Sequence, residues 1–223
     1  MITIEQLRFE PYLLKEIEEQ NKEMCMAAVQ SDPFALQYVK EQDEELCMEV
    51  VKQCGAAIEF VKEQSEKICM AAVQENGWAI TEIKHKTKEL YREAIKSTPR
   101  VLQAIEEQDE ELCILAVSLD PLTICYVKEQ TDRICYEAVR RNGRMLQYVK
   151  NKTREICMEA VKNVGFALEY IDDQDEELCS QAVKTDGGAL QYVKEQTEAI
   201  CLEAVKQDPY ALLYVKIDFM YKV

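Results

Sequence analysis

The chain has 223 residues, of which 48% are hydrophobic and 31% are charged, so it carries enough apolar material for a folded core and too much for a disordered tail. The 42 Asp and Glu residues outnumber the 27 Lys and Arg residues, and the net charge of −15 argues against a general binder of DNA, RNA or anionic membranes. One His cannot build a metal site of several His ligands, and six Gly leave little material for phosphate-binding loops, so no cofactor is expected.

The sequence also argues against a membrane location. No stretch approaches the roughly 18 apolar residues needed to cross a bilayer. The N-terminal segment MITIEQLRFE carries Glu and Arg where a secretory signal would be apolar. We therefore expect a cytoplasmic protein.

A repeat of 22 residues runs along the chain. Eight of the ten Cys fall on one series with this step, in which only position 91 is not Cys but Tyr; the series is Cys25, Cys47, Cys69, Cys113, Cys135, Cys157, Cys179 and Cys201. Residues 1–24 are predicted to form a partial repeat that caps the N-terminal end, residues 25–216 the repeats themselves, and residues 217–223 an apolar C-terminal cap.

Pro and Gly punctuate the chain once per repeat. All five Pro and five of the six Gly occupy a single repeat position, which begins at Pro11 and ends at Pro209. The residue before this position is usually of a type that caps a helix N-terminus, as in Asp32-Pro33. A second N-cap position follows later in each repeat, as at Asp43. Each repeat is therefore predicted to hold two short helices.

Apolar residues form one helical stripe in each predicted helix. The stripe of the first helix is Leu46, Cys47, Val50 and Val51 in one repeat, and that of the second helix is Ala35, Leu36, Tyr38 and Val39. Helices this short are unstable alone, so each pair must bury its stripe against the pairs before and after it. The predicted fold is all-α: a single domain over residues 1–223, built as a right-handed α-solenoid of nine two-helix repeats after the N-terminal partial repeat.

The phrases ALQYVKEQ, ICLEAVKQ and DPYAL resemble the short helical repeats of the family named domain of unknown function 4116. The resemblance covers nearly the whole chain, from about Thr3 to Lys216, and rests on the recurring pattern rather than on one motif. It implies a relation to repeat proteins of giant viruses, amoebae, phages and some bacteria. It implies no activity and supplies no catalytic residues.

The Cys series is predicted to be structural. Equivalent residues of stacked helices lie about 8–10 Å apart, beyond the reach of a disulfide, and no CxxC or Cys/His pairing occurs. These thiols should be small buried side chains, whereas Cys54 and Cys125 lie outside the series and should be accessible. The recurring Tyr, as at Tyr38 and Tyr192, should line the core or a groove rather than stack on nucleic acid bases.

The position after Pro or Gly, which we call the variable position, differs most between repeats. Aromatic and Arg side chains recur there, and these types dominate binding hot spots in protein interfaces. The predicted partner-binding residues are Trp78, Arg100, Arg144, Phe166 and Tyr210.

Two segments are basic against the acidic background. Seven Lys and Arg lie between Arg133 and Arg154 against Glu137 alone, and six lie between Lys84 and Arg100 against two Glu. They are either a solvated face or a site for an anionic ligand; the residues predicted for such a site are Lys86, Lys88, Arg140, Arg141, Lys152 and Arg154. The acidic triplet Asp-Glu-Glu recurs with a step of 66 residues, at Asp43, Asp109 and Asp175. Either the gene grew by duplication of blocks of three repeats, or three repeats complete one superhelical turn and align these charges.

We expect a non-catalytic scaffold that binds a protein partner. Glu82, His85 and Tyr91 are the best candidates for acid-base chemistry, but no nucleophile motif or second His accompanies them. With the family resemblance, the specific expectation is a viral or phage protein that inhibits a host or defence factor. The alternatives are a binder of a small anionic ligand, such as a nucleotide signal, and an acidic mimic of nucleic acid. The apolar residues of the C-terminal cap either fold back or form a homodimer contact; they are Ile217, Phe219, Met220, Tyr221 and Val223.

Overall fold

A computed structural model describes residues 2–216 of the protein. They fall into two compact units, Met1–Glu106 and Glu107–Val223, each a stack of helix pairs. In the first unit the elements are α1 (Ile4–Phe9), η1 (Pro11–Glu16), α2 (Lys22–Ser31), η2 (Pro33–Tyr38), α3 (Glu44–Gln53), η3 (Gly55–Phe60), α4 (Glu66–Glu75), η4 (Gly77–Glu82), α5 (Lys88–Ser97) and η5 (Pro99–Ala104). In the second they are α6 (Glu110–Leu119), η6 (Pro121–Tyr126), α7 (Asp132–Arg141), η7 (Gly143–Tyr148), α8 (Arg154–Asn163), η8 (Gly165–Tyr170), α9 (Glu176–Thr185), η9 (Gly187–Tyr192), α10 (Glu198–Gln207) and η10 (Pro209–Tyr214).

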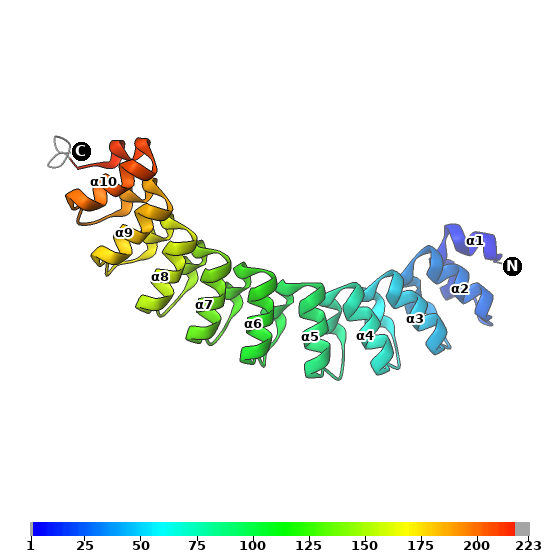
Figure 1. The fold of residues 1–223 in the computed structure, drawn as a ribbon. Helices are drawn as coiled ribbons and strands as arrows, with labels where there is room; N and C mark the ends of the chain where they lie inside the picture. The colour runs from blue at the N-terminus through cyan, green and yellow to red at the C-terminus, as the bar shows by residue number, and fades with distance from the viewer. Residues whose placement is uncertain (1, 217–223) are drawn as a thin grey trace. The chain divides into compact units, whose positions relative to one another are not determined.

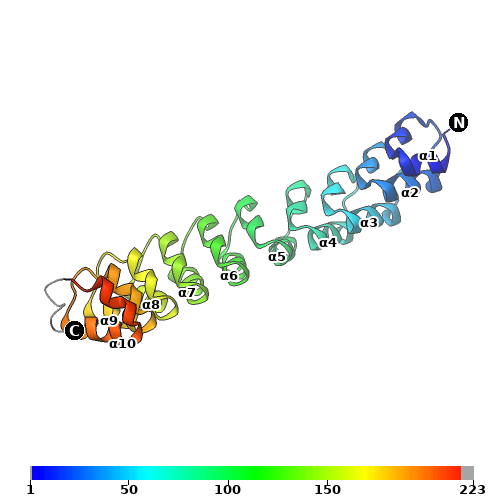
Figure 2. The same ribbon diagram turned by 90° about the horizontal axis from the view of Figure 1, so that it is seen from above.

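The predicted α-solenoid of two-helix repeats is confirmed. Within each unit the α-helices lie side by side in one layer and the η helices in another (Figures 1 and 2). The N-terminal partial repeat holds the shortened helix α1 and a complete η1. The handedness of the solenoid stays a prediction.

The N-cap residues set where the α-helices begin. In α2 to α10 the cap side chain accepts a hydrogen bond from the backbone N–H three residues later, at 2.7–2.8 Å for the three Asp caps and 3.3–3.4 Å for the Ser and Thr caps. The bond from the Leu46 N–H holds the pKa of Asp43 below its usual value. Predicted cap positions and observed helix starts therefore agree along the chain.

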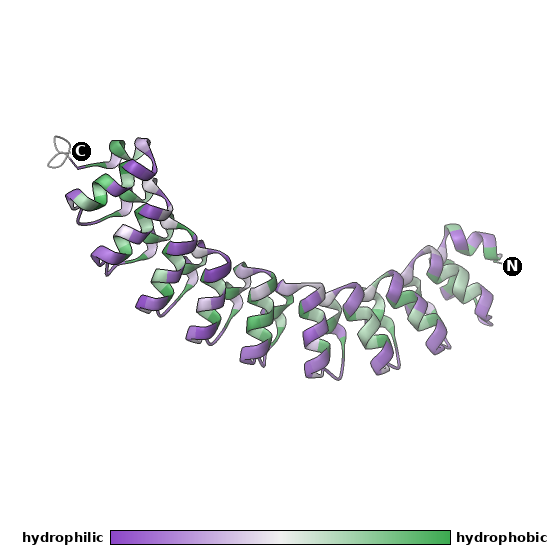
Figure 3. Cartoon of the chain, in the orientation of Figure 1, coloured by the Kyte–Doolittle hydropathy of each residue, from purple (hydrophilic) through white to green (hydrophobic). Residues whose placement is uncertain are grey.

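The second helix of each repeat is a 3-10 helix of six residues, which the sequence did not distinguish from an α-helix. It ends where the N–H of the following residue bonds three residues back, as from Val39 to the Leu36 carbonyl at 3.0 Å. Three residues per turn place Leu36 and Val39 on one face, and both are buried with Ala35. Figure 3 shows these apolar stripes where neighbouring helices face one another and hydrophilic residues at the helix ends.

The Pro and Gly position lies where consecutive repeats approach most closely. A Cβ added at Gly55, Gly77, Gly143 or Gly165 would lie 2.3 Å from an Ala carbonyl oxygen of the next α-helix. Each repeat-position Gly donates its N–H to a side-chain oxygen of the next repeat, as from Gly143 to Asn163 Oδ1 at 2.7 Å. Pro needs no such acceptor because it lacks the N–H.

A ladder of Gln side chains joins consecutive repeats. Gln42 Nε2 donates to the carbonyls of Leu36 at 3.3 Å and Phe60 at 3.0 Å, and Gln42 Oε1 accepts the Lys62 N–H at 2.9 Å. The same bonds recur in what we call the glutamine ladder. The distance from Gln Nε2 to the carbonyl oxygen 18 residues later is 2.8–3.1 Å, and that from the Lys backbone N to Gln Oε1 is 2.9–3.0 Å. The members of the ladder are Gln20, Gln42, Gln64, Gln108, Gln130, Gln174 and Gln196.

The ladder is interrupted at two places. Lys86 and Lys152 stand where the other repeats have Gln, and Glu106 and Asp172 stand where they have the Lys that the Gln binds. Lys86 Nζ turns back to the Ile83 carbonyl at 2.7 Å. At these positions the amide that would bridge two repeats is replaced by a group that only donates.

The last described repeat leaves core positions uncovered. Leu212 is 45% exposed, whereas Leu190, at the same position one repeat earlier, is fully buried. The predicted C-terminal cap, residues 217–223, lies outside the described residues. Within residues 2–216 no helix has the length and hydropathy to cross a membrane.

We expect Gly143→Ala to lower the free energy of unfolding by about 1–3 kcal/mol, because the new methyl group overlaps the Ala160 carbonyl oxygen. Gly188→Ala is the control, since its Cβ would meet only the movable ring of Phe166, at 3.1 Å. Chemical denaturation of both variants checks the expectation, and equal losses would contradict it.

Lys152→Gln should raise the free energy of unfolding by about 1 kcal/mol, because it restores an amide within reach of the Tyr170 carbonyl and the Asp172 N–H. Asn151→Gln, at an exposed neighbouring position, should have little effect. Denaturation curves of both variants measure the difference. A Lys152→Gln protein no more stable than the parent would speak against the role assigned to the amide.

Candidate functional site: the variable positions of the 3-10 layer

The variable position is the second residue of each 3-10 helix, and in several repeats the side chain of the preceding cap residue holds its backbone N–H. Asp32 Oδ1 accepts the Phe34 N–H at 2.9 Å, Asn76 Oδ1 accepts that of Trp78 at 3.0 Å, and Asn142 Oδ1 accepts that of Arg144 at 3.1 Å. The side chain itself points to the outer surface of the 3-10 layer. Before Arg100, Phe166 and Gly188 the cap residue makes no such bond, so this hydrogen bond holds the backbone in only some repeats, whereas the side chain differs from one repeat to the next.

Aromatic residues at the variable position pack against the recurring Tyr or Phe of the next repeat. The ring centroids lie 5.8 Å apart for Tyr12 and Tyr38, and 6.1 Å apart for Phe166 and Tyr192, and both pairs meet edge to face. Phe34 and Phe60 form a third such pair at 6.0 Å. The recurring Tyr thus lines an outer surface and is only partly buried, so the prediction that it lies in the core is wrong.

The five predicted partner-binding residues fall on both units. In the first unit Trp78 on η4 is 38% exposed, and Arg100 on η5 is also exposed. In the second unit Arg144 on η7 is exposed, Phe166 on η8 is half-buried, and Tyr210 on η10 is 76% exposed. Within each unit these residues lie on one layer, in adjacent or nearby repeats.

The structure separates the predicted anion-binding residues. Lys86 and Lys88 lie at the start of α5 in the first unit. In the second unit Arg140 and Arg141 lie at the C-terminal end of α7, whereas Lys152 and Arg154 lie at the N-terminal end of α8. Because α7 and α8 run parallel (Figure 1), these two pairs are at opposite edges of the layer and do not form one site.

Most of these cations in the second unit are already paired. Glu137 accepts from Arg140 at 2.7 Å and from Arg141 at 2.9 Å. Burial alone would raise the pKa of Glu137, but the two Arg hydrogen bonds hold it below its usual value. Arg154 pairs with Asp175 at 2.9 Å and also with Glu177. The excess of basic residues read from the sequence is therefore partly neutralised within the fold.

A hollow of about 890 Å³ lies beside the interrupted ladder position at Lys152. Three cations line it together with acidic residues from the segments before α9 and α10: Asp172, Asp173, Asp175, Glu176 and Glu195. A smaller hollow, of about 570 Å³, occupies the same place beside Gln20. The hollow is thus a recurring feature of this edge and not a pocket particular to Lys152.

The Cys predictions are confirmed. All eight Cys of the series are buried, Cys54 is partly exposed and Cys125 is exposed, and no Cys is in a disulfide. Burial, with nearby acidic residues, raises the pKa of Cys113, Cys135 and Cys179 to about 11. In six repeats the thiol also lies 3.6–3.9 Å from the ladder Gln oxygen, as Cys47 does from Gln42 Oε1.

Sequence reasoning missed the glutamine ladder. The signal was present in the Glu-Gln that precedes most N-caps, as in Glu41-Gln42, but an isolated polar residue in a loop is ordinarily solvated. Only the stacked arrangement shows that the amide reaches two repeats.

Comparison with known families supports the repeat assignment. The model of the family described as Domain of unknown function (DUF4116) matches residues 21–65, 43–86, 131–174 and 175–220. No curated protein and no solved structure matches the chain.

We expect iodoacetamide at pH 8 to modify Cys125 and Cys54 before any Cys of the buried series, because the buried thiols are shielded and their pKa values are raised. Mass spectrometry of the native protein after increasing exposure gives the order. The buried thiols should react only once denaturant is added. Modification of Cys135 ahead of Cys125 would contradict this placement.

Proposed function

This chain belongs to the DUF4116 family, and we propose that it is a non-catalytic repeat scaffold that binds a protein partner through its variable positions. The observation that carries the proposal is the contrast between constant and variable positions. Caps, core residues, Gly or Pro and, in most repeats, the ladder Gln recur because the stacking depends on them, while the variable position holds aromatic, Arg, Leu or small residues in different repeats.

The chemistry of the variable position suits an interface. Trp, Tyr and Arg are enriched in binding hot spots because they combine a large contact area with a polar or charged group. Trp78 and Tyr210 are exposed, so their apolar surface would be removed from water on binding. The short 3-10 helices hold these side chains on fixed backbone, which limits the entropy lost on association.

The family resemblance gives the proposal a specific form. In that form the chain is a viral or phage protein whose repeat surface engages and inhibits a host or defence factor. A partner of this kind would contact the same outer surface of the 3-10 layer. The capture experiment described below therefore tests both the general proposal and this specific form.

An anionic-ligand site is the weaker candidate. Arg140, Arg141 and Arg154 are engaged by acidic residues of the chain, and a ligand would have to displace those contacts. The edge that carries Lys152 is also rich in Asp and Glu.

We expect the double variant Trp78→Ala/Phe166→Ala and the single variant Arg144→Glu each to weaken partner capture about tenfold or more without unfolding, because they remove hot-spot side chains that are exposed at Trp78 and Arg144 and half-buried at Phe166. The measurement is affinity capture from a lysate of the natural host with quantitative mass spectrometry. Circular dichroism establishes that the variants remain folded.

Gln103→Ala and Gln147→Ala provide the matched controls, since both residues are exposed on the same 3-10 layer but outside the variable position. One stoichiometric protein that is lost from the variants and retained by these controls supports the proposal. Capture that is unchanged in all variants would overturn it, as would a thermal shift with nucleotides in the absence of any protein partner.

A further inference from the structure

Four consecutive repeats of the second unit carry a cation at the same place in the last turn of the α-helix. We call them the basic row: Arg140 on α7, Lys162 on α8, Lys184 on α9 and Lys206 on α10. All four are exposed. In the first unit the row is broken, because Gln30 and Gln74 alternate with Lys52 and Lys96 at this position.

The three Lys of the row are uncommitted. Among residues 2–216, Lys162, Lys184 and Lys206 form neither an ion pair nor a side-chain hydrogen bond, whereas Arg140 shares Glu137 with Arg141. A cation in the last turn of an α-helix is stabilised by the negative end of the helix dipole, and this explains a single Lys at this place. The dipole does not supply the ammonium groups with an ion-pair or hydrogen-bond partner.

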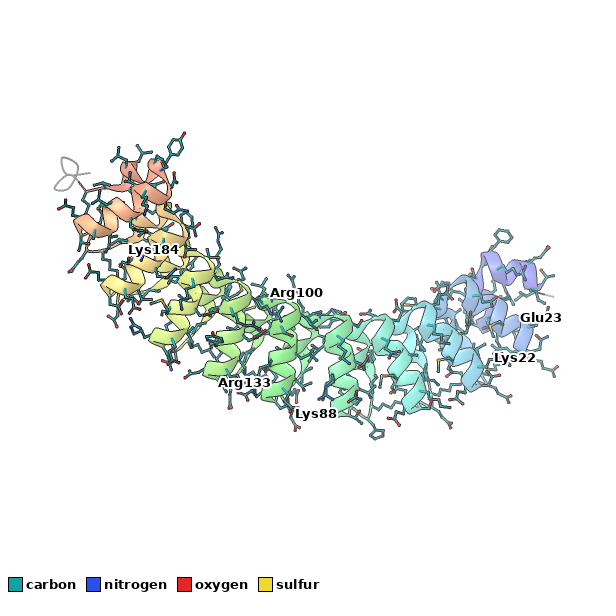
Figure 4. All side chains as sticks on the ribbon, in the orientation of Figure 1. Lys22, Glu23, Lys88, Arg100, Arg133 and Lys184 are labelled. Carbon is teal, nitrogen blue, oxygen red and sulfur yellow. The ribbon has the colours of Figure 1, made fainter. Side chains whose placement is uncertain are left out.

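The two edges of the α layer in the second unit differ in charge. Figure 4 labels Arg133 at the edge where the α-helices begin and Lys184 towards the edge where they end. The edge of Arg133, where the α-helices begin, also carries the acidic triplets that start at Asp109 and Asp175. Glu159 and Glu203 lie three residues before Lys162 and Lys206, and Asp186 and Asp208 lie two residues after Lys184 and Lys206, so the edge of the basic row carries charges of both signs. An acidic chain is repelled less at this edge than at the opposite one, and the three Lys without partners are the groups that can hold it.

The spacing of the row points to a particular ligand geometry. Neighbouring packed α-helices lie about 8–10 Å apart, so equivalent cations recur at about that distance. A polyproline II segment advances about 9.3 Å in each turn of three residues. A β-strand presents side chains to one face about every 6.6–6.8 Å, which does not match. Acidic residues at every third position of an extended segment therefore match the row.

Residues of the variable position adjoin the row: Arg144 and Tyr210 are exposed and Phe166 is half-buried. Arg144, Phe166 and Tyr210 each follow a row cation by four residues, on the 3-10 helix that continues from the same α-helix. They offer aromatic surface and a further cation beside the ammonium groups. Aromatic surface of this kind is what Pro-rich extended segments bind.

We propose that the basic row binds an extended, Pro-containing acidic segment of the partner protein, with Asp or Glu at every third residue. This inference rests on the proposed function and names the chemistry of the partner at the second unit. Opposite charges set the position of the segment along the row, and the adjoining variable residues contact the apolar side chains between the acidic ones.

Fluorescence anisotropy of the full chain with two labelled peptides tests the inference. One peptide consists of five Glu-Pro-Pro triplets, and the other has the same composition with its Glu residues at irregular spacing. We expect the periodic peptide to bind severalfold more tightly, and its affinity to fall as salt is raised. Equal affinity for the two peptides, or no binding of either, would overturn the inference.

The matched variants carry the same change in net charge. Lys162→Glu/Lys184→Glu should weaken binding of the periodic peptide about tenfold, whereas Lys52→Glu/Lys67→Glu in the first unit should leave it unchanged. Equal losses in both variants, or tighter binding of oligouridylate than of the peptide at the row, would reject an acidic peptide as its ligand. If partner capture still depends on Trp78 and Phe166 while the periodic peptide fails to bind, the proposed function stands and this inference alone is wrong.

Discussion

The stacking depends on a partly buried glutamine amide that recurs in most repeats. Consecutive segments between the 3-10 and α helices run next to one another without forming a sheet, so their backbone carbonyl and N–H groups have no regular partners. A ladder Gln such as Gln130 supplies them: it donates to the carbonyls of Ile124 and Tyr148 and accepts from the N–H of Lys150. Buried polar groups left without partners cost more than a formed hydrogen bond gains. The amide therefore stabilises the register between the repeats that carry it, while the repeats with Lys86 or Lys152 keep the same length without it.

The second constraint is the close approach at Gly, which acts at the opposite edge of each repeat. The next helix presents an Ala carbonyl where a Cβ would stand, and a side chain such as Asn163 accepts the Gly143 N–H. With the two edges fixed in this way, the outer surface of the 3-10 layer is the place where substitutions cost least. Variation at Trp78, Arg144 or Phe166 leaves these contacts intact, and for this reason we propose these positions as the place of binding specificity.

The helical repeat, its caps and its buried positions followed from the sequence because each depends on local chemistry that recurs in register. Asp43 caps a helix, Val50 and Val51 face the core, and Cys47 is buried, as the pattern predicts. The 3-10 geometry did not follow, because Pro33 and Ala35 suit the start of either helix type. Neither did the role of Gln42 or the pairing of Arg140 with Glu137, since each depends on neighbours that only the folded chain determines. The predicted anionic site assumed that residues close in sequence share a surface, and the parallel helices place them at opposite edges.

Replacing one ladder Gln tests the role of the ladder amide most directly. In Gln130→Leu the side chain keeps its approximate volume but leaves the Tyr148 carbonyl and the Lys150 N–H without the amide, so the free energy of unfolding should fall by about 1–3 kcal/mol. Gln147→Leu is the reference, because Gln147 is exposed and donates only to the Arg144 carbonyl of its own helix. Urea denaturation that shows this loss for position 130 and little change for position 147 is the predicted result. Equal stability of the two variants would contradict the central role of the ladder.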